Sequence, residues 1–178
     1  MQYSDEIIAK AEQVKLVIFD VDGVLTDGGL YFTDDGREIK KFNVKDGLGI
    51  AILVKKGIEV AVITGRNSVI VADRMKSLGV NHVYQGRMNK LETYENLKLA
   101  MNISDHQVAF VGDDIIDLPI MRRCSLSVAV ADAHDEVKAQ AVLVLEKCGG
   151  MGAGRDVCDL IMRAQGLAHE FATDDNNQ

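Results

Sequence analysis

The segment KLVIFDVDG, residues 15–23, carries the strongest indication of the fold. Its apolar residues predict a strand over 15–20 that is buried on both faces, as in a parallel sheet covered by helices. Such a strand delivers Asp20 to the carboxyl edge of the sheet, and Gly23 lets the backbone turn sharply just beyond it. Residues 58–64 and 107–111 repeat this pattern. Shorter apolar runs predict three more strands, over 81–84, 126–130 and 142–145.

Helix-length segments separate these strands. We expect helices over 46–56, 68–78, 89–101 and 156–165, the first two ending at Gly57 and Gly79. Asn89 is expected to cap the third of them, with Glu92 as a capping-box partner. Alternating strands and helices predict an α/β fold with a doubly wound parallel sheet, in which ligands bind beyond the carboxyl ends of the strands.

Two segments interrupt the alternation. Residues 28–45, GGLYFTDDGREIKKFNVK, predict a β-hairpin inserted after the first strand, where a helix is due. Residues 149–154, GGMGAG, precede a helical pattern as a dinucleotide-binding loop would, but position 155 is Arg instead of the third Gly, which excludes that function. We expect one domain over residues 1–167 and a frayed polar tail over 168–178.

The composition of the chain excludes some classes of binding partner and indicates its cellular compartment. The 178 residues carry a formal net charge of −7, which argues against nucleic acid or an anionic membrane as the main partner. Three cysteines without a CxxC pair make a disulfide framework or a zinc site improbable. The polar N-terminus does not resemble a signal peptide, and no window approaches the roughly 18 apolar residues of a membrane span. We therefore expect a cytoplasmic location.

Acidic residues follow two of the strongest predicted strands. Asp20 ends the first and Asp22 follows it, and Asp113, Asp114 and Asp117 follow the strand over 107–111. If these carboxylates converge at one edge of the sheet, they repel one another unless a cation lies among them, and hard oxygen ligands favour Mg²⁺. Each group also has a plainer interpretation, as turn residues or as helix caps.

Candidate phosphate-binding groups lie at the ends of other elements. The strand over 58–64 ends at Thr64 and is followed by Gly65 and Arg66, so that a hydroxyl, backbone N–H groups and a guanidinium form an anion site. Lys90 stands at the start of a predicted helix, where its charge opposes the helix dipole and suggests an anionic partner. Taken singly, an ordinary helix cap and a surface lysine explain these residues as well.

Together, these elements resemble a known family. DVDGVLT (20–26), ITGR (63–66), Lys90 and GDDIID (112–117) are similar, in order and at each strand end, to the four motifs of the haloacid dehalogenase superfamily of phosphohydrolases, which share a Rossmann-like core. This similarity spans residues 15–130. The hairpin in place of a cap domain, NVKDGLGI (43–50) and GGMGAGRDVCDLI (149–161) resemble the superfamily's phosphatases for 3-deoxy-D-manno-octulosonate 8-phosphate, extending the similarity to nearly the whole chain.

The resemblance implies a two-step phosphoryl transfer. Asp20 is the expected nucleophile, and Asp22 the expected acid and base. The implied Mg²⁺ ligands are the side chains of Asp20 and Asp113 and the backbone carbonyl of Asp22. Thr64 and Lys90 would hold the phosphoryl oxygens, while Asp114 and Asp117 would orient Lys90 and metal-bound water. The implied substrate contacts are Asp22, Asn43, Val44, Lys45, Asp46, Gly47, Arg66, Arg74, Lys90 and Arg155.

The resemblance also implies an assembly and a pathway. Family members form homotetramers through their hairpins, and Arg155 would reach the site of a neighbouring subunit. The expected activity is hydrolysis of the octulosonate 8-phosphate in lipopolysaccharide biosynthesis. Two alternatives remain: a phosphatase for a related nine-carbon sugar-acid phosphate, and a regulatory domain without catalytic activity. The GGMGAGR segment favours the octulosonate 8-phosphate over the nine-carbon substrate. The joint presence of Asp20, Asp22, Lys90 and Asp113 argues against a regulatory domain.

Overall fold

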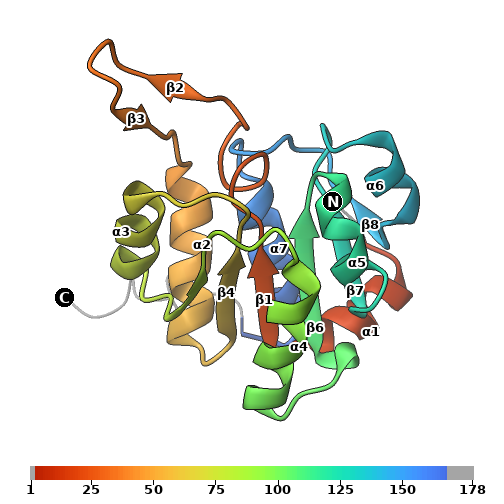
Figure 1. Cartoon of the computed structure of the whole chain (residues 1–178). Coiled ribbons are helices and arrows are strands. Elements are labelled where there is room, and N and C mark those ends of the chain that lie inside the picture. The colour runs from red at the N-terminus through yellow and green to blue at the C-terminus, as the bar shows by residue number, and fades with distance from the viewer. Residues whose placement is uncertain (1–2, 168–178) are drawn as a thin grey trace, which may run out of the picture.

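The apolar runs form a six-stranded parallel sheet at the centre of the molecule (Figure 1). The computed structural model describes residues 3–167 of the chain. Its sheet has the order β5-β4-β1-β6-β7-β8. The strands are β1 (Leu16–Phe19), β4 (Glu59–Ile63), β5 (His82–Tyr84), β6 (Val108–Gly112), β7 (Leu126–Ala129) and β8 (Leu143–Val144). All six predicted strands are therefore confirmed.

Helices cover both faces of the sheet. They are α1 (Asp5–Glu12), α2 (Val44–Lys55), α3 (Val69–Ser77), α4 (Lys90–Met101), α5 (Leu118–Met121), α6 (Asp135–Gln140) and α7 (Ala153–Ala164). Helix α7 packs between α1 and α2, while α5 packs against α4 and α6. Right-handed crossovers place α2 and α3 on one face and α4, α5 and α6 on the other, because the chain reverses direction across the sheet after β5. The predicted doubly wound α/β fold is confirmed.

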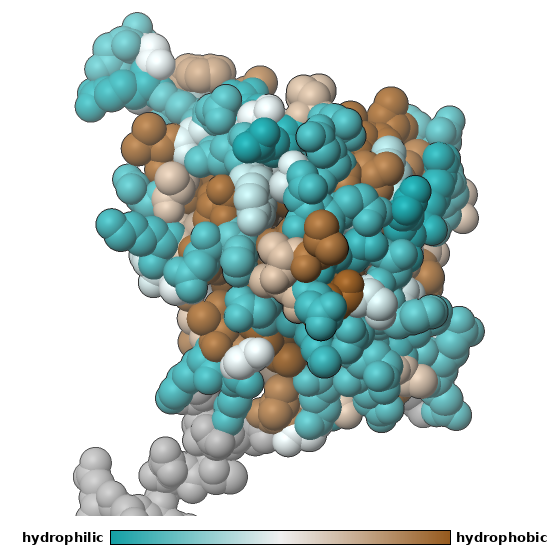
Figure 2. Space-filling view, turned by 60° about the horizontal axis from the view of Figure 1, so that its bottom comes forward, coloured by the Kyte–Doolittle hydropathy of each residue, from teal (hydrophilic) through white to brown (hydrophobic). Residues whose placement is uncertain are grey.

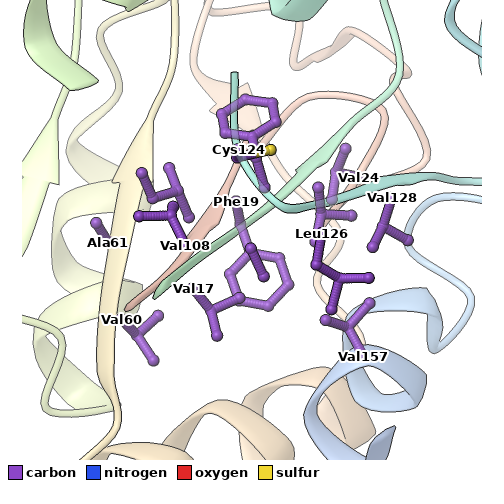
Figure 3. Packing of buried hydrophobic residues seen from close by; sticks show 14 of the residues in the cluster. Val17, Phe19, Val24, Val60, Ala61, Val108, Cys124, Leu126, Val128 and Val157 are labelled. Atoms are coloured by element: carbon purple, nitrogen blue, oxygen red, sulfur yellow. The ribbon is translucent and has the colours of Figure 1, made fainter. Parts of the chain in front are cut away.

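The core lies on both sides of β1. All four residues of this strand are buried, and they pair in parallel register with β4 and β6. Side chains from the central strands and from α7 interdigitate in this core, including Phe19, Leu126 and Val157 (Figure 3). The strands lack polar alternation because neither face of the sheet meets water.

The hairpin is present but shorter than its predicted range of 28–45. It comprises β2 (Tyr31–Phe32) and β3 (Glu38–Ile39), joined by a turn with Gly36 at φ +80°, and it projects from the body of the molecule (Figure 1). The hairpin ends before the predicted limit at residue 45, because α2 already begins at Val44. The Asn43 side chain accepts a hydrogen bond from the Lys45 N–H and starts the helix there.

Other differences concern local elements. The prediction that the Asn89 side chain caps α4 is wrong. Asn89 stands at the N-cap position, but its side chain makes no capping hydrogen bond. Helix α7 begins three residues before the predicted start. Gly154 lies in its first turn, where the helix packs closely against Leu25 and Asp46. The short α5 and α6, and the 3₁₀ turns η1 (Asp105–Gln107) and η2 (Ile115–Asp117), are too brief for apolar periodicity to reveal.

Hydrophilic side chains predominate on the face shown in Figure 2, where hydrophobic ones form small separate groups. Among residues 3–167, no helix has the length and apolar character needed to cross a membrane. The predicted tail over 168–178 lies outside the described residues.

A buried tyrosine ties α4 to the turn before β6. The Tyr94 hydroxyl donates to Asp105 Oδ1 over 2.5 Å, and Lys98 pairs with the same carboxylate. Tyr94→Phe should lower the free energy of unfolding by about 1.5 to 3 kcal/mol, the usual range for a hydrogen bond to a charged group, as measured by urea unfolding. Tyr84→Phe, at a half-buried tyrosine of β5, is the control and should change stability by less than about 0.5 kcal/mol. Equal stability of Tyr94→Phe and the native chain would contradict this role.

Candidate active site

Three central strands end side by side at one edge of the sheet. Asp20 follows β1, Thr64 follows β4 and Asp113 follows β6. The pairing of β1 with both neighbours sets this arrangement, and it continues past the strand end, where the Asp20 N–H donates to the Val111 carbonyl over 3.0 Å. This edge is where the chain changes winding direction, the usual place for a ligand in a doubly wound sheet.

Three carboxylates converge here. One oxygen each from Asp20, Asp113 and Asp117 lies within 4.8 Å of the others. Burial, opposed by Lys90, raises the pKa of Asp20 to about 6. Burial together with the charges of Asp20 and Asp117 raises the pKa of Asp113 to about 8. Of the acidic residues predicted to converge from the two strand ends, Asp20, Asp113 and Asp117 do so, whereas Asp22 and Asp114 lie outside this group.

Lys90 reaches into this cluster from the first turn of α4. The residue is only 1 % exposed. Its Nζ lies 3.0 Å from Asp20 Oδ2 and 2.7 Å from Asp117 Oδ1. Although burial alone lowers the pKa of Lys90, the two carboxylates outweigh it and raise that pKa above its usual value. The alternative of a solvated surface lysine is therefore wrong.

Asp117 organises the loop after β6. It is fully buried, and its Oδ2 accepts hydrogen bonds from the backbone N–H groups of Asp113 at 3.0 Å and Asp114 at 3.3 Å. Its other oxygen accepts from Lys90. Gly112 is required beside it, because a Cβ there would overlap the Asp117 carboxyl group. Asp114 instead accepts from the Ile115 N–H over 2.7 Å, as a cap does.

The loop after β1 folds back on the cluster. The Val21 N–H donates to Asp20 Oδ1 over 2.6 Å. Gly23 has φ +91°, and a Cβ at this position would overlap the Asp113 carboxylate. Asp22 turns toward the hairpin, where it forms an ion pair with Lys40, and Arg66 Nε lies 4.0 Å from Asp22 Oδ2.

Sequence reasoning missed the hairpin residues of this site. Lys40 pairs with Asp22 and also lies 3.5 Å from Glu38. Glu38 in turn accepts from Arg66 at 3.1 Å and from Ser68 Oγ at 2.6 Å. The two-residue spacing of Glu38 and Lys40 was the available signal, since it places both on one face of a strand. Charged residues in a hairpin are nevertheless usually solvated.

The predicted sugar-acid contacts gather where α2 and α7 begin. The Asn43 amide donates to the Gly150 carbonyl over 3.2 Å, and Asp46 Oδ1 accepts from the Arg155 N–H over 2.8 Å. Arg74 lies so close to Gly47 that a Cβ there would overlap its guanidinium. Val44 and Lys45 are exposed.

Arg155 does not touch the carboxylate cluster of its own chain. Its side chain pairs with Asp159 at 2.7 Å, one turn along α7. The glycine-rich segment before it lies against the loop after β1, where the Gly150 N–H donates to the Val24 carbonyl over 2.9 Å.

The cluster fits a hard divalent cation. Asp113 Oδ1 is buried and has no hydrogen-bond partner among the described residues. Three carboxylates face a single lysine, so negative charge exceeds positive charge in a site with little access to water. Mg²⁺ favours carboxylate oxygens, and it would relieve this imbalance.

The chain is similar to proteins of known name. A family model described as haloacid dehalogenase-like hydrolase matches residues 78–148. The protein named 3-deoxy-D-manno-octulosonate 8-phosphate phosphatase KdsC of Escherichia coli strain K12 is 50 % identical over 167 residues, covering 94 % of this chain and 89 % of that protein.

Solved structures agree with this similarity. The phosphatase of the same name from Yersinia pestis has a TM-score of 0.91 at 46 % identity, covering 92 % of this chain and 89 % of that one. The enzyme of Moraxella catarrhalis, solved with magnesium, phosphate and 3-deoxy-D-manno-octulosonate (KDO), has a TM-score of 0.90 at 39 % identity, covering 92 % and 94 %.

Replacing Asp117 should weaken the fold as well as the site. Asp117→Asn removes a buried charge that neutralises Lys90, and we expect the free energy of unfolding to fall by about 3 kcal/mol in urea titrations. Asp114→Asn, three residues away and exposed, retains a capping oxygen and should change stability by less than about 0.5 kcal/mol. Similar losses in both variants would refute a special role for Asp117.

Proposed function

Because the chain belongs to the 3-deoxy-D-manno-octulosonate 8-phosphate phosphatases of the haloacid dehalogenase-like hydrolases, we propose that it hydrolyses this ester to the free sugar acid and phosphate. The observation that carries the proposal is the buried Asp20–Lys90–Asp117 cluster beside Asp113 at the edge of the sheet. A related enzyme has been solved with magnesium, phosphate and the sugar acid KDO. This activity belongs to lipopolysaccharide biosynthesis.

Asp20 is the proposed nucleophile. Its carboxylate attacks phosphorus and the bond to the sugar oxygen breaks, which yields an aspartyl phosphate and divides one difficult displacement into two. The backbone hydrogen bond from Val21 and the ion pair with Lys90 support this role, because they hold the carboxylate in one orientation. Lys90 and Thr64 then bind the phosphoryl oxygens, where their positive charge and hydroxyl stabilise the transition state.

Asp22 is the proposed acid and base. It donates a proton to the departing sugar oxygen and afterwards accepts one from the water that attacks the aspartyl phosphate. Its position two residues after the nucleophile, in the loop braced by Gly23 and Thr26, supports this assignment. A regulatory domain without catalysis would need no second carboxylate at this point.

The proposed ligands of Mg²⁺ are the side chains of Asp20 and Asp113 and the backbone carbonyl of Asp22. The bound ion supplies positive charge that offsets the charge building on the phosphoryl group. The unpartnered oxygen of Asp113 supports its inclusion. Asp117 is proposed as a positioning residue for Lys90, because it is fully buried and joins the Lys90 ammonium to the backbone N–H groups of Asp113 and Asp114. Asp114 is proposed to orient metal-bound water.

The sugar acid is proposed to contact Asp22, Arg66, Arg74, Lys90 and the segment 43–47 at the start of α2. The guanidinium groups would bind its carboxylate or hydroxyl oxygens. A related nine-carbon sugar-acid phosphate remains the second candidate substrate. The glycine-rich segment before Arg155 favours the eight-carbon compound.

We also propose a homotetramer in the cytoplasm. Support for assembly comes from the hairpin, where Leu30, Tyr31, Phe32 and Ile39 are exposed apolar side chains. In such an assembly Arg155 is proposed to contact substrate in a neighbouring subunit. A reducing compartment is supported by the free thiols of Cys124, Cys148 and Cys158.

The activity is tested by phosphate release from the octulosonate ester, a nine-carbon sugar-acid phosphate and hexose phosphates. We expect preference for the first, loss of turnover on chelation with EDTA and recovery when Mg²⁺ is added. Asp20→Asn should lower turnover about a thousandfold or more, because the nucleophile is lost. Asp34→Asn, in the hairpin turn, should leave it unchanged. Equal rates on hexose phosphates would overturn the substrate, and an active Asp20→Asn would overturn the nucleophile.

The assembly is tested by sedimentation velocity. Phe32 is 59 % exposed, so Phe32→Asp should dissociate a hairpin-mediated tetramer without lowering the melting temperature of the isolated subunit. Leu99→Asp, at an exposed leucine of α4, is the control and should sediment as the native chain does. A tetramer that persists in Phe32→Asp, or a native chain that is monomeric, would refute the proposal.

A further inference from the structure

The base of the hairpin places a buried lysine on the side chain of Asp22. Lys40 directly follows β3, a strand of only two residues outside the main sheet, yet its side chain is 2 % exposed. Its ammonium group pairs with Asp22 Oδ1 and lies 3.5 Å from Glu38 Oε1. A lysine in such a peripheral element is ordinarily solvated, and burial of its charge requires close partners.

Glu38 connects this lysine to the start of α3. Its Oε1 accepts from Arg66 over 3.1 Å, and its Oε2 accepts from Ser68 Oγ over 2.6 Å. The hydrogen bond from Ser68 and the charges of Lys40 and Arg66 outweigh partial burial and hold the pKa of Glu38 below its usual value. Lys40 is therefore held from one side by an anchored carboxylate, while its other partner is Asp22.

These polar contacts hold the base of the hairpin to the site, together with Phe42, which packs against the hydrophobic core. The apolar side chains of Tyr31, Phe32 and Ile39 are exposed instead of entering the core. A second polar link runs from Asp27, in the loop after β1, to the Tyr31 hydroxyl at 3.1 Å. The orientation of the Asp22 carboxylate thus depends on a hairpin that contributes nothing to the main sheet.

We propose that Lys40 is a positioning residue, which aims the Asp22 carboxyl group at the departing sugar oxygen. This inference rests on the proposed function, and it adds a residue that the four motifs do not include. Lys40 acts through Asp22 and does not contact the substrate. Its removal should therefore impair only reactions in which the leaving group needs a proton.

The test compares leaving groups. A sugar alkoxide leaves only with a proton, whereas p-nitrophenolate leaves readily without one. We expect Lys40→Met to lower kcat/KM for the octulosonate ester by about 10-fold or more, a part of the 100-fold or greater effect of a general acid. For p-nitrophenyl phosphate the loss should stay below about 3-fold. The ratio kcat/KM includes departure of the leaving group and excludes later hydrolysis of the aspartyl phosphate.

A double-variant cycle separates positioning from substrate contact. If Lys40 acts through Asp22, Lys40→Met should cause no further loss in an Asp22→Asn background. Lys40→Arg, which keeps the charge, should restore part of the activity. Arg37→Met, at an exposed arginine in the same hairpin, is the matched control and should resemble the native enzyme.

Three results would overturn the role of Lys40. These are equal losses on both esters, an additive loss in the Asp22→Asn background, and native activity of Lys40→Met. Melting temperatures identify a variant that fails to fold. If Lys40→Met does not fold, the role of Lys40 is tested with Lys40→Arg, alone and combined with Asp22→Asn. If the native enzyme ignores the octulosonate ester, the proposed function fails. The leaving-group comparison then proceeds with any alkyl phosphate that the enzyme does hydrolyse.

Discussion

The site depends on a buried imbalance of charge. Lys90 pairs with both Asp20 and Asp117 within hydrogen-bonding distance, and Asp113 stands beside them with an unpartnered oxygen. Removing one partner from such a cluster is costly because water cannot replace it. The excess of carboxylate over ammonium makes the same cluster receptive to a divalent cation. Stability and metal binding therefore have a common electrostatic origin.

The sheet supplies the geometry for this cluster. Parallel pairing of β1 with β6 brings Asp20 beside the loop that carries Asp113 and Asp117. Two glycines make the approach possible, since a Cβ at Gly23 would meet Asp113 and a Cβ at Gly112 would meet Asp117. The buried apolar strands thus act as a rigid frame, and the acidic residues lie where that frame ends.

Two peripheral segments converge on the loop after β1. The hairpin reaches it through the ion pair of Lys40 with Asp22, and the glycine-rich segment reaches it through the hydrogen bond from Gly150 to Val24. The second contact explains the run of glycines better than dinucleotide binding does, because a Cβ at Gly149 or Gly150 would overlap the backbone of this loop. The loop that carries Asp22 is held from two sides, by the hairpin that follows it and by the glycine-rich segment much later in the chain.

The sheet, the strand ends and the acidic residues there could be predicted from the sequence, because apolar strands of this kind must be buried on both faces and their carboxyl ends must share an edge. The sequence also indicated Lys90 through an unfavourable position at a helix start. Tertiary structure alone decided the partners of Glu38 and Lys40. Their spacing shows that they share a face, but the direction in which a short hairpin leans depends on contacts between distant segments. The same reason hid the packing of Arg74 on Gly47 and the bond from Arg155 to Asp46.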